Sequence, residues 1–408
     1  MSHFNKPDAG IRKRTSTFSR GRSNKPKPGL QKHNYRVEHM DALGQGVCKQ
    51  EGAITFIAKT LPGESGVARI HKRSKGVQFA TVDAADELSP KRIAAECEHF
   101  QQCPGCHYLH TDYQTELGFK QDALTKIMQP LLRSGHLSEK SISVVAAPER
   151  LSYRNRMQLH YRHKYIGLVD AATNQVIEIP NCKMIRPELQ TEFDALYGDK
   201  AWSESREGKG HCELYLDESG EVKETWDSDY ADGGFTQVND AMNTVLKSLV
   251  SDEVLNAKKT PSRLLDLFSG NGNLSESILE KSDLEKSDLE GREPALTRVM
   301  VDVVPNDHED YLKIDLFDEG AIKRFKKRSS FTQFDSILID PPRKGFPALA
   351  DWIKACKPKQ LIYVSCNAAT MARDLQALEG KFTIDKMILV DLFPSTYHFE
   401  TVACLSFK

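Results

Sequence analysis

Three residues in the C-terminal part of the chain, Asp340, Cys366 and Glu400, have side chains suited to covalent and acid–base chemistry. A cysteine thiolate is a strong nucleophile, and a carboxylate can take a proton from a reacting carbon. An apolar run ends directly before Asp340, and another ends at Val364, two positions before Cys366, as apolar runs do at the ends of buried parallel strands. Because the carboxyl ends of parallel strands meet at one edge of a sheet, we expect these side chains to share one crevice.

Cysteine is often an inert core residue, so the surroundings of Cys366 decide between a structural and a catalytic role. Ser365 and Asn367 flank it with polar groups, and a helix is predicted directly afterwards, including 371–375. A helix N-terminus would lower the pKa of the thiol and make it nucleophilic. Glu400 alone would more often be a surface residue, and only its combination with the cysteine and the aspartate favours a catalytic role.

A second candidate site is the motif Asp-x-Phe-x-Gly-x-Gly at 266–272, which follows an apolar run and precedes a helix predicted near Leu274. Glycines at a strand end let the backbone approach a ligand closely. Ser275 stands where a dinucleotide-binding fingerprint has its third glycine, so pyrophosphate binding is not favoured. The shorter motif suits a ligand with an amino-acid part and a nucleoside, and Asp302, after the next apolar run, could bind its ribose.

Four cysteines form a third candidate site, with Cys97, Cys103 and Cys106 in one short segment and Cys182 farther along. Nine cysteines in a chain expected to be cytosolic argue for metal binding or catalysis rather than for disulfides. Four thiolates suit a tetrahedral zinc ion or an iron–sulfur cluster. The unequal spacing does not match the paired cysteine knuckles of a zinc ribbon.

Several structural units are needed to position these sites, and a chain of 408 residues is long enough to form them. We expect a disordered basic tail at 1–33, a small β-barrel at 34–90, a mostly β central domain at 91–234 and a catalytic domain at 235–408. The catalytic domain is expected to be an α/β, doubly wound, Rossmann-like sheet. A helix is expected over about 112–132.

Charge and hydropathy limit the classes of function. The formal net charge is −1, but residues 1–36 carry many lysines and arginines and only Asp8 as an acid. Such a tail, with basic barrel residues such as Lys59 and Arg69, suits a phosphate backbone, although a solubilising tail is the plainer alternative. No apolar run reaches the roughly 18 residues of a membrane span, and the N-terminus lacks the apolar core of a signal peptide. We therefore expect a cytoplasmic protein that contacts no membrane.

Taken together, these motifs resemble those of the RNA 5-methyluridine methyltransferases. The resemblance covers about residues 35–408, and the joint occurrence of the motifs is highly specific. Residues 35–82 resemble the family's N-terminal TRAM barrel, which is OB-like, and the four cysteines resemble its 4Fe-4S site. The other matching motifs are Phe235-x-Gln237-x-Asn239, the Asp-x-Phe-x-Gly-x-Gly motif, Asp340-Pro341-x-Arg343-x-Gly345, Ser365-Cys366-Asn367 with Met371-Ala372-Arg373-Asp374, and His398-x-Glu400.

The resemblance implies an activity and a cofactor. S-adenosylmethionine would donate a methyl group, Cys366 would attack C6 of a uracil, and Glu400 would remove the C5 proton after methyl transfer. Asp340 matches the residue that contacts the target base, and Arg343 would support its loop. The positions that match cofactor-binding residues of the family are Gln237, Phe268, Gly270, Asp302, Asp315 and Asp340.

The resemblance also implies the partners. A TRAM barrel together with a 4Fe-4S site is most similar to the bacterial enzymes that act on 23S ribosomal RNA, and the target uridine must be unpaired or flipped out. A transfer-RNA substrate and a catalytically impaired RNA-binding relative are the alternatives. A redox sensor ranks last, because Cys366 would then have no role. We expect a monomer.

One segment departs from the family pattern. Only 303–310 separate the strand that ends at Asp302 from the next predicted strand, at 311–315. A parallel crossover usually needs about ten to twelve residues or more and contains a helix. Either the sheet edge is rearranged or the adenosine pocket is incomplete.

Overall fold

The computed structural model describes residues 32–407, apart from 51, 199, 218, 229–236, 257–260, 288–295 and 379–381. The basic tail predicted at 1–33 lies outside the described residues, except for its last two positions, which begin the first strand. Phe235, from one of the motifs, also lies outside them. Among the described residues, we find no helix that is long and apolar enough to cross a membrane.

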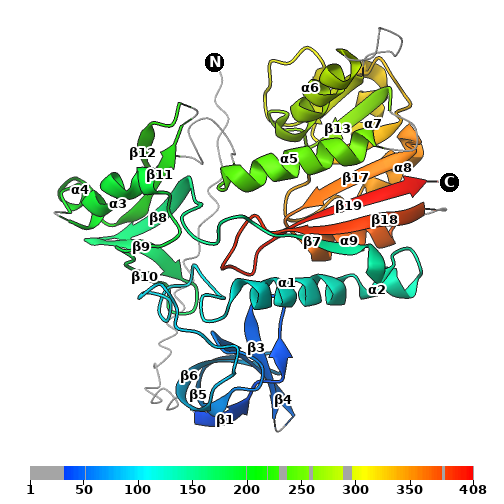
Figure 1. The fold of residues 1–408 in the computed structure, drawn as a ribbon. Coiled ribbons are helices and arrows are strands. Elements are labelled where there is room, and N and C mark those ends of the chain that lie inside the picture. The colour runs from blue at the N-terminus through cyan, green and yellow to red at the C-terminus, as the bar shows by residue number, and fades with distance from the viewer. Residues whose placement is uncertain are drawn as a thin grey trace, which may run out of the picture.

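The N-terminal strands form a six-stranded sheet in the order β1-β5-β6-β4-β3-β2. Its strands are β1 (Lys32–Arg36), β2 (His39–Met40), β3 (Gln45–Gln50), β4 (Ala53–Ala58), β5 (Ser65–Ser74) and β6 (Val77–Glu87). Neighbouring strands are antiparallel except for β4 and β6. The sheet curls around a small apolar core that includes Tyr35, Ile57 and Ile70 (Figure 1). This N-terminal β domain confirms the small β unit expected from the short β-rich runs.

Helices α1 (Tyr113–Ile127) and α2 (Gln129–Arg133) lie between the N-terminal β domain and the largest sheet (Figure 1). Asp112 caps α1, because its carboxylate accepts a hydrogen bond from Thr115 N. The single helix expected over 112–132 is therefore present but divided in two. Pro130 accounts for the division, since proline has no N–H to donate and is favoured in the first turn of a new helix.

The central part of the chain forms a five-stranded antiparallel sheet in the order β10-β9-β8-β11-β12. Its strands are β8 (Arg156–Arg162), β9 (Tyr165–Asp170), β10 (Gln175–Ile177), β11 (Lys209–Leu216) and β12 (Val222–Trp226). Helices α3 (Gln190–Tyr197) and α4 (Trp202–Ser205) pack on this sheet through Phe193 and Trp202, which meet Leu159 in one core. The mostly β central unit predicted from the sequence is thus confirmed.

The C-terminal part forms an eight-stranded sheet in the order β15-β14-β13-β16-β17-β19-β18-β7. Only the pairs made by β19 are antiparallel. The strands are β7 (Ile142–Val145), β13 (Arg263–Leu267), β14 (Thr297–Asp302), β15 (Tyr311–Lys313), β16 (Ser336–Ile339), β17 (Gln360–Ser365), β18 (Phe382–Val390) and β19 (Glu400–Phe407).

Helices cover both faces of this large sheet (Figure 1). They are α5 (Asp240–Leu255), α6 (Asn273–Ser287), α7 (Ala321–Arg328), α8 (Leu349–Cys356) and α9 (Ala368–Gln376). One apolar core contains Leu246 of α5 and Ile278 of α6, and the other contains Phe325 of α7, Trp352 of α8 and Met371 of α9. The doubly wound α/β sheet expected from the sequence is confirmed, with its strand order reversing between β13 and β16.

The connection between β14 and β15 is as short as the sequence indicates. The two strands pair in parallel, with Met300 opposite Tyr311, and residues 303–310 form no helix. The alternative of a rearranged sheet edge is therefore wrong. Local contacts hold the short connection, because the Tyr311 hydroxyl donates to the Asp302 carbonyl at 2.8 Å. The adenosine side of the predicted cofactor site consequently lacks a covering helix within the segment 303–310.

Candidate active site and cysteine site

Asp340, Cys366 and Glu400 meet at one edge of the large sheet. Asp340 directly follows β16, and Cys366 directly follows β17, which pairs with β16 in parallel. Strand β19 runs antiparallel to β17 with Thr401 opposite Ser365, so its first residue, Glu400, lies beside Cys366. The structure therefore brings together the three residues that the sequence predicts for covalent chemistry.

The electrostatic surroundings of Cys366 differ from the expectation. Burial, followed by the charge of Glu400, raises the pKa of the thiol to about 11, while Arg343 opposes this rise. The predicted lowering of this pKa by the helix N-terminus is wrong, because desolvation and nearby carboxylates outweigh it. Burial also raises the pKa of Asp340 to about 7 and holds the pKa of Glu400 well above its ordinary value. The free protein therefore retains protons in this crevice near neutral pH.

Helix α9 fixes the loop that follows β16. Asp374, the last residue of the Met-Ala-Arg-Asp motif, accepts hydrogen bonds from Phe346 N at 2.6 Å and from the Tyr363 hydroxyl at 2.7 Å. Gly345 has a φ of 73°, and a Cβ there would lie 2.5 Å from an oxygen of Asp374. Only glycine lets the backbone pass this closely, so the motif and the glycine together position the loop that begins at Asp340.

The glycine-containing loop after β13 faces the same edge. Phe268 and Gly270 have left-handed backbone conformations, with φ of 61° and 53°, which turn the chain sharply into α6. The Asp302 carboxylate accepts hydrogen bonds from Gly270 N at 2.9 Å and from Val303 N at 2.6 Å. Burial raises the pKa of Asp266, at the end of β13, to about 7. Asp302 therefore braces the loop.

The remaining predicted cofactor residues are Gln237 and Asp315, which lie before α5 and after β15. Gln237 precedes α5, and its carbonyl accepts a hydrogen bond from Asn155 Nδ2 at 3.0 Å. Asp315 is exposed just beyond β15 and accepts a hydrogen bond from Phe317 N at 2.9 Å. The rings of Phe268 and Phe317 lie 5.5 Å apart between centroids, so the chain after β15 adjoins the glycine-containing loop.

The four cysteines line one small apolar cavity. Cys97, Cys103, Cys106 and Cys182 face it together with Phe100. The Cys103 sulfur also accepts a hydrogen bond from a backbone N–H at 3.3 Å. Within the part of the chain that the structure describes, no group of three or more His, Cys, Asp or Glu side chains is arranged to hold a metal ion. The structure thus gathers the four thiols without defining a single-ion centre.

Two cations that the sequence did not point to lie beside these thiols. Lys59, from the end of β4, donates to the Cys103 carbonyl at 2.8 Å and lies 4.8 Å from the centre of the Phe100 ring. Burial raises the pKa of Cys106 to about 12, and the charge of Arg154 opposes this rise. The sequence suggested that Lys59 binds phosphates, but its amine is directed toward residues 97–106, called the cysteine segment below.

The fold and this site define the class of the protein. The strand order, the glycine-containing loop at the reversal point and the polar strand ends are those of a Rossmann-like class I methyltransferase domain. Among solved structures, the Pyrococcus abyssi tRNA (uracil-54, C5)-methyltransferase, in complex with S-adenosyl-L-homocysteine, has a similar fold. The TM-score is 0.64 at 20% sequence identity, over 91% of this chain and 100% of that chain.

Comparison of the sequences shows which proteins this chain resembles. The family model described as tRNA (Uracil-5-)-methyltransferase matches residues 318–408. The 23S rRNA (uracil(1939)-C(5))-methyltransferase RlmD of Shewanella woodyi is 26% identical, over 95% of this chain and 98% of that protein. The protein of the same name from Marinomonas sp. is 27% identical, over 98% of this chain and 100% of that protein. The chain is therefore similar over nearly its whole length to proteins named as RNA uracil-C5 methyltransferases, and its C-terminal part matches the family model.

Proposed function

We propose that this protein methylates C5 of a specific uridine in 23S ribosomal RNA through a covalent adduct with Cys366. The observation that carries the proposal is the meeting of Cys366, Glu400 and Asp340 beside the glycine-containing loop. Covalent methylation of a pyrimidine needs a nucleophile, a proton acceptor and a group that binds the nucleobase. Cys366, Glu400 and Asp340 can supply these roles next to a loop suited to a nucleoside. The similarity to RlmD proteins over nearly the whole chain supports 23S ribosomal RNA as the substrate.

Cys366 is required because C5 of uracil is not nucleophilic enough to attack a sulfonium methyl group. Its thiolate adds to C6, and the C5=C6 electron pair then forms an enolate in which C5 is the nucleophile. S-adenosylmethionine, when bound, supplies the electrophilic methyl group. Since burial raises the pKa of the thiol, Cys366 must release its proton to water as the substrate binds, and Arg343 stabilises the resulting thiolate.

Glu400 and Asp340 manage the protons in the remaining steps. The Glu400 carboxylate takes the C5 proton, the electrons of that C–H bond re-form C5=C6, and the bond between C6 and the Cys366 sulfur breaks. Glu400 must first lose its own proton to water, and its raised pKa then makes the carboxylate a stronger base than an exposed glutamate. Asp340, with a pKa of about 7, can accept a hydrogen bond from N3 when ionised or donate one to O4 when protonated.

The proposed cofactor residues lie at different depths. They are Gln237, Phe268, Gly270, Asp302, Asp315 and Asp340. Asp302 is 8% exposed and hydrogen-bonded to the glycine-containing loop, whereas Asp315 lies exposed beyond the short strand β15. We therefore expect the part of the cofactor near Asp302 to be held more firmly than the part near Asp315.

We also propose that Cys97, Cys103, Cys106 and Cys182 hold a 4Fe-4S cluster. All four thiols face one apolar cavity, where a multi-iron cluster could be shielded from water. A thiolate-bound cluster carries negative charge, and Lys59 supplies a partly buried positive charge beside it. When bound, such a cluster supplies either electron transfer or a rigid cross-link between distant segments. We favour the cross-link, because Cys182 is far in the sequence from Cys97, Cys103 and Cys106.

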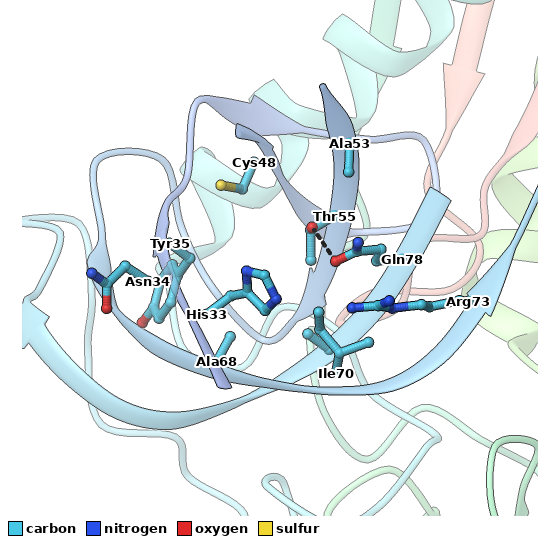
Figure 2. Close-up of a pocket in the computed structure, with 11 residues that line it drawn as sticks. His33, Asn34, Tyr35, Cys48, Ala53, Thr55, Ala68, Ile70, Arg73 and Gln78 are labelled. Atoms are coloured by element: carbon cyan, nitrogen blue, oxygen red, sulfur yellow. Dashed lines mark hydrogen bonds between the residues drawn. The ribbon is translucent and has the colours of Figure 1, made fainter. Parts of the chain in front are cut away.

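The N-terminal β domain offers a further contact for RNA. A cavity of about 200 Å³ opens in its sheet, lined by the buried Tyr35 and Ile70 and by the more exposed His33, Gln78 and Arg73 (Figure 2). Amide and guanidinium groups can bind base edges, and imidazole rings can stack on bases. We propose that this domain binds substrate RNA outside the target nucleotide.

The proposed substrate can be tested with purified protein, S-adenosylmethionine and two RNAs, a 23S ribosomal RNA transcript and total tRNA. We expect 5-methyluridine at one position of the 23S transcript and none in tRNA. Methylation of tRNA alone would favour the transfer-RNA alternative, which the fold of the Pyrococcus abyssi enzyme suggests. No 5-methyluridine in either RNA, with cofactor bound, would contradict the proposed function. The molecular mass of the active fraction in solution tests whether the protein is a monomer, as we expect.

A further inference from the structure

The segment 391–399, called the base loop below, joins β18 to β19 and ends directly before Glu400. It contains no helix or strand, so its conformation depends on the groups that bind its backbone. In Figure 1 this red loop reaches toward the end of α1 at which that helix begins. Several of its partners come from 107–153, in the first half of the chain, rather than from the catalytic domain.

Ser395, in the middle of the base loop, is bound on both sides. Its N–H donates to Glu116 Oε1 of α1 at 2.6 Å. Its carbonyl accepts hydrogen bonds from His107 N at 2.7 Å and from Tyr108 N at 3.1 Å. Ser395 is fully buried with a φ of 67°, and a non-glycine residue in that conformation costs about 1–3 kcal/mol. These contacts therefore hold a backbone geometry that would not persist without them.

Buried charges fix Glu116 in turn. Lys120 donates to Glu116 Oε1 and to Asp391 Oδ1, both at 2.8 Å, and the three side chains are at most 1% exposed. Arg150 donates to Glu116 Oε2 and to the Tyr108 carbonyl, both at 2.8 Å. Two carboxylates and two cations make this network electrically neutral. Removing one member would leave a buried charge without its partner, which costs folding free energy. Glu116 thus joins α1, the cysteine segment and the base loop.

The same contacts lead to the cysteine site. His107 and Tyr108 directly follow Cys106 in the sequence. Tyr153 packs in one apolar cluster with Cys106, and its hydroxyl donates to the Pro394 carbonyl at 3.1 Å. Residues next to the cysteine cavity therefore hold the base loop at two neighbouring positions.

We propose that Glu116 is a positioning residue for Glu400, and that the cysteine site supports catalysis by fixing the residues that hold the base loop. This inference rests on the proposed function. It assigns the effect to one step, in which Glu400 takes the C5 proton, the C–H electrons re-form C5=C6 and the bond from C6 to the Cys366 sulfur breaks. Addition of Cys366 and methyl transfer depend on β17 and α9, whereas the side-chain hydrogen bonds of Glu116 among the described residues go to Lys120, Arg150 and Ser395.

Glu116→Ala tests the positioning role, because it removes the acceptor of the Ser395 N–H. We expect methyl transfer to proceed while a covalent complex of protein and methylated RNA accumulates. Decay of that complex should slow by about tenfold to a hundredfold, as small displacements of a catalytic group do. Rapid-quench kinetics with a labelled methyl group measures the two steps separately, and Glu400→Gln provides the reference for a complex that cannot decay.

Glu213→Ala is the matched control. Glu213 is also a buried carboxylate, 3.5 Å from Arg156, but it lies in the central sheet. Its variant should lose thermal stability and leave the decay of the complex at the wild-type rate. If Glu116→Ala slows methyl transfer and decay equally, or behaves like Glu213→Ala, the positioning role is wrong. If wild-type protein forms no 5-methyluridine, the proposed function fails instead.

Two further measurements keep the inference testable if Glu116→Ala does not fold. Tyr153→Phe removes only the hydroxyl that binds the Pro394 carbonyl, and it should slow the same decay by a smaller factor. Hydrogen exchange of 391–399 should be faster in metal-depleted protein than in protein whose metal is bound. Unchanged decay in Tyr153→Phe would overturn the positioning role, and unchanged exchange would overturn the link to the cysteine site.

Discussion

The two sides of the active edge of the large sheet are built differently. On the β16-β17-β19 side, buried acids such as Asp374 and Glu116 hold the loops next to the reacting residues. On the β14-β15 side, the segment 303–310 has no helix, and Val303 and Val304 are 53% and 55% exposed. The side that performs the chemistry is thus rigidly held, whereas part of the cofactor side is open. We expect chemistry and cofactor affinity to be separable by mutation.

Cys366→Ala should have the largest effect, because it removes the nucleophile on the rigid side. We expect turnover to fall by at least about ten-thousandfold, with no covalent complex, as for other lost nucleophiles. Cofactor binding, measured by calorimetry, should stay within about twofold of wild type, since a group that acts in the reaction need not contribute to ground-state binding. Remaining turnover above that level would show that another residue activates C5.

Cys97→Ala should abolish metal binding. Protein prepared without oxygen is expected to be brown and to contain iron and sulfide, because four thiols face one cavity. The variant should lose both elements and unfold at a lower temperature, which elemental analysis and calorimetry measure. One zinc ion per chain without sulfide would contradict the proposed cluster.

Asn306→Ala should weaken the cofactor side selectively. Asn306 Nδ2 donates to the Gly270 carbonyl at 2.9 Å, so it connects the short segment to the glycine-containing loop. Loss of a hydrogen bond of about 1 kcal/mol should raise the Kd for S-adenosylmethionine about fivefold and leave kcat at saturation nearly unchanged. Tyr363→Phe, which removes the bond to Asp374, is the mirror variant and should lower kcat with little change in that Kd. If each variant changed Kd and kcat by similar factors, cofactor affinity and chemistry would not be separable as we expect.

Glu400→Gln should stabilise the fold at high pH. Burial raises the pKa of Glu400, so the folded protein binds this proton more tightly than the unfolded chain does. Its contribution to stability is therefore present below the unfolded pKa of about 4.3 and is lost as pH rises. The melting temperature of the variant minus that of wild type should grow from pH 5 to pH 8. The exposed control Asp315→Asn should show no such growth.

The positions of Asp340 and Cys366 could be predicted from the sequence because each follows an apolar run, whereas Glu400 begins its strand and was predicted only in combination with them. Strand direction then places Cys366 and Glu400 side by side. The surroundings could not be predicted, because they come from distant segments. Glu116 and Lys120 have the i,i+4 spacing of an exposed helical pair, yet Asp391, from 271 residues beyond Lys120, joins them in the interior. The sequence predicts a lowered pKa for the Cys366 thiol, whereas burial and acids from other strands raise it.

The most direct test of the central claim is to identify the bond between protein and RNA. Glu400→Gln can accept no C5 proton, so attack and methyl transfer should proceed while release stalls. After incubation with RNA and S-adenosylmethionine, the complex is digested with trypsin and ribonuclease and analysed by mass spectrometry. The account predicts a 5-methyluridine nucleotide attached to the peptide at Cys366. Attachment at another residue, or normal turnover without any complex, would contradict it.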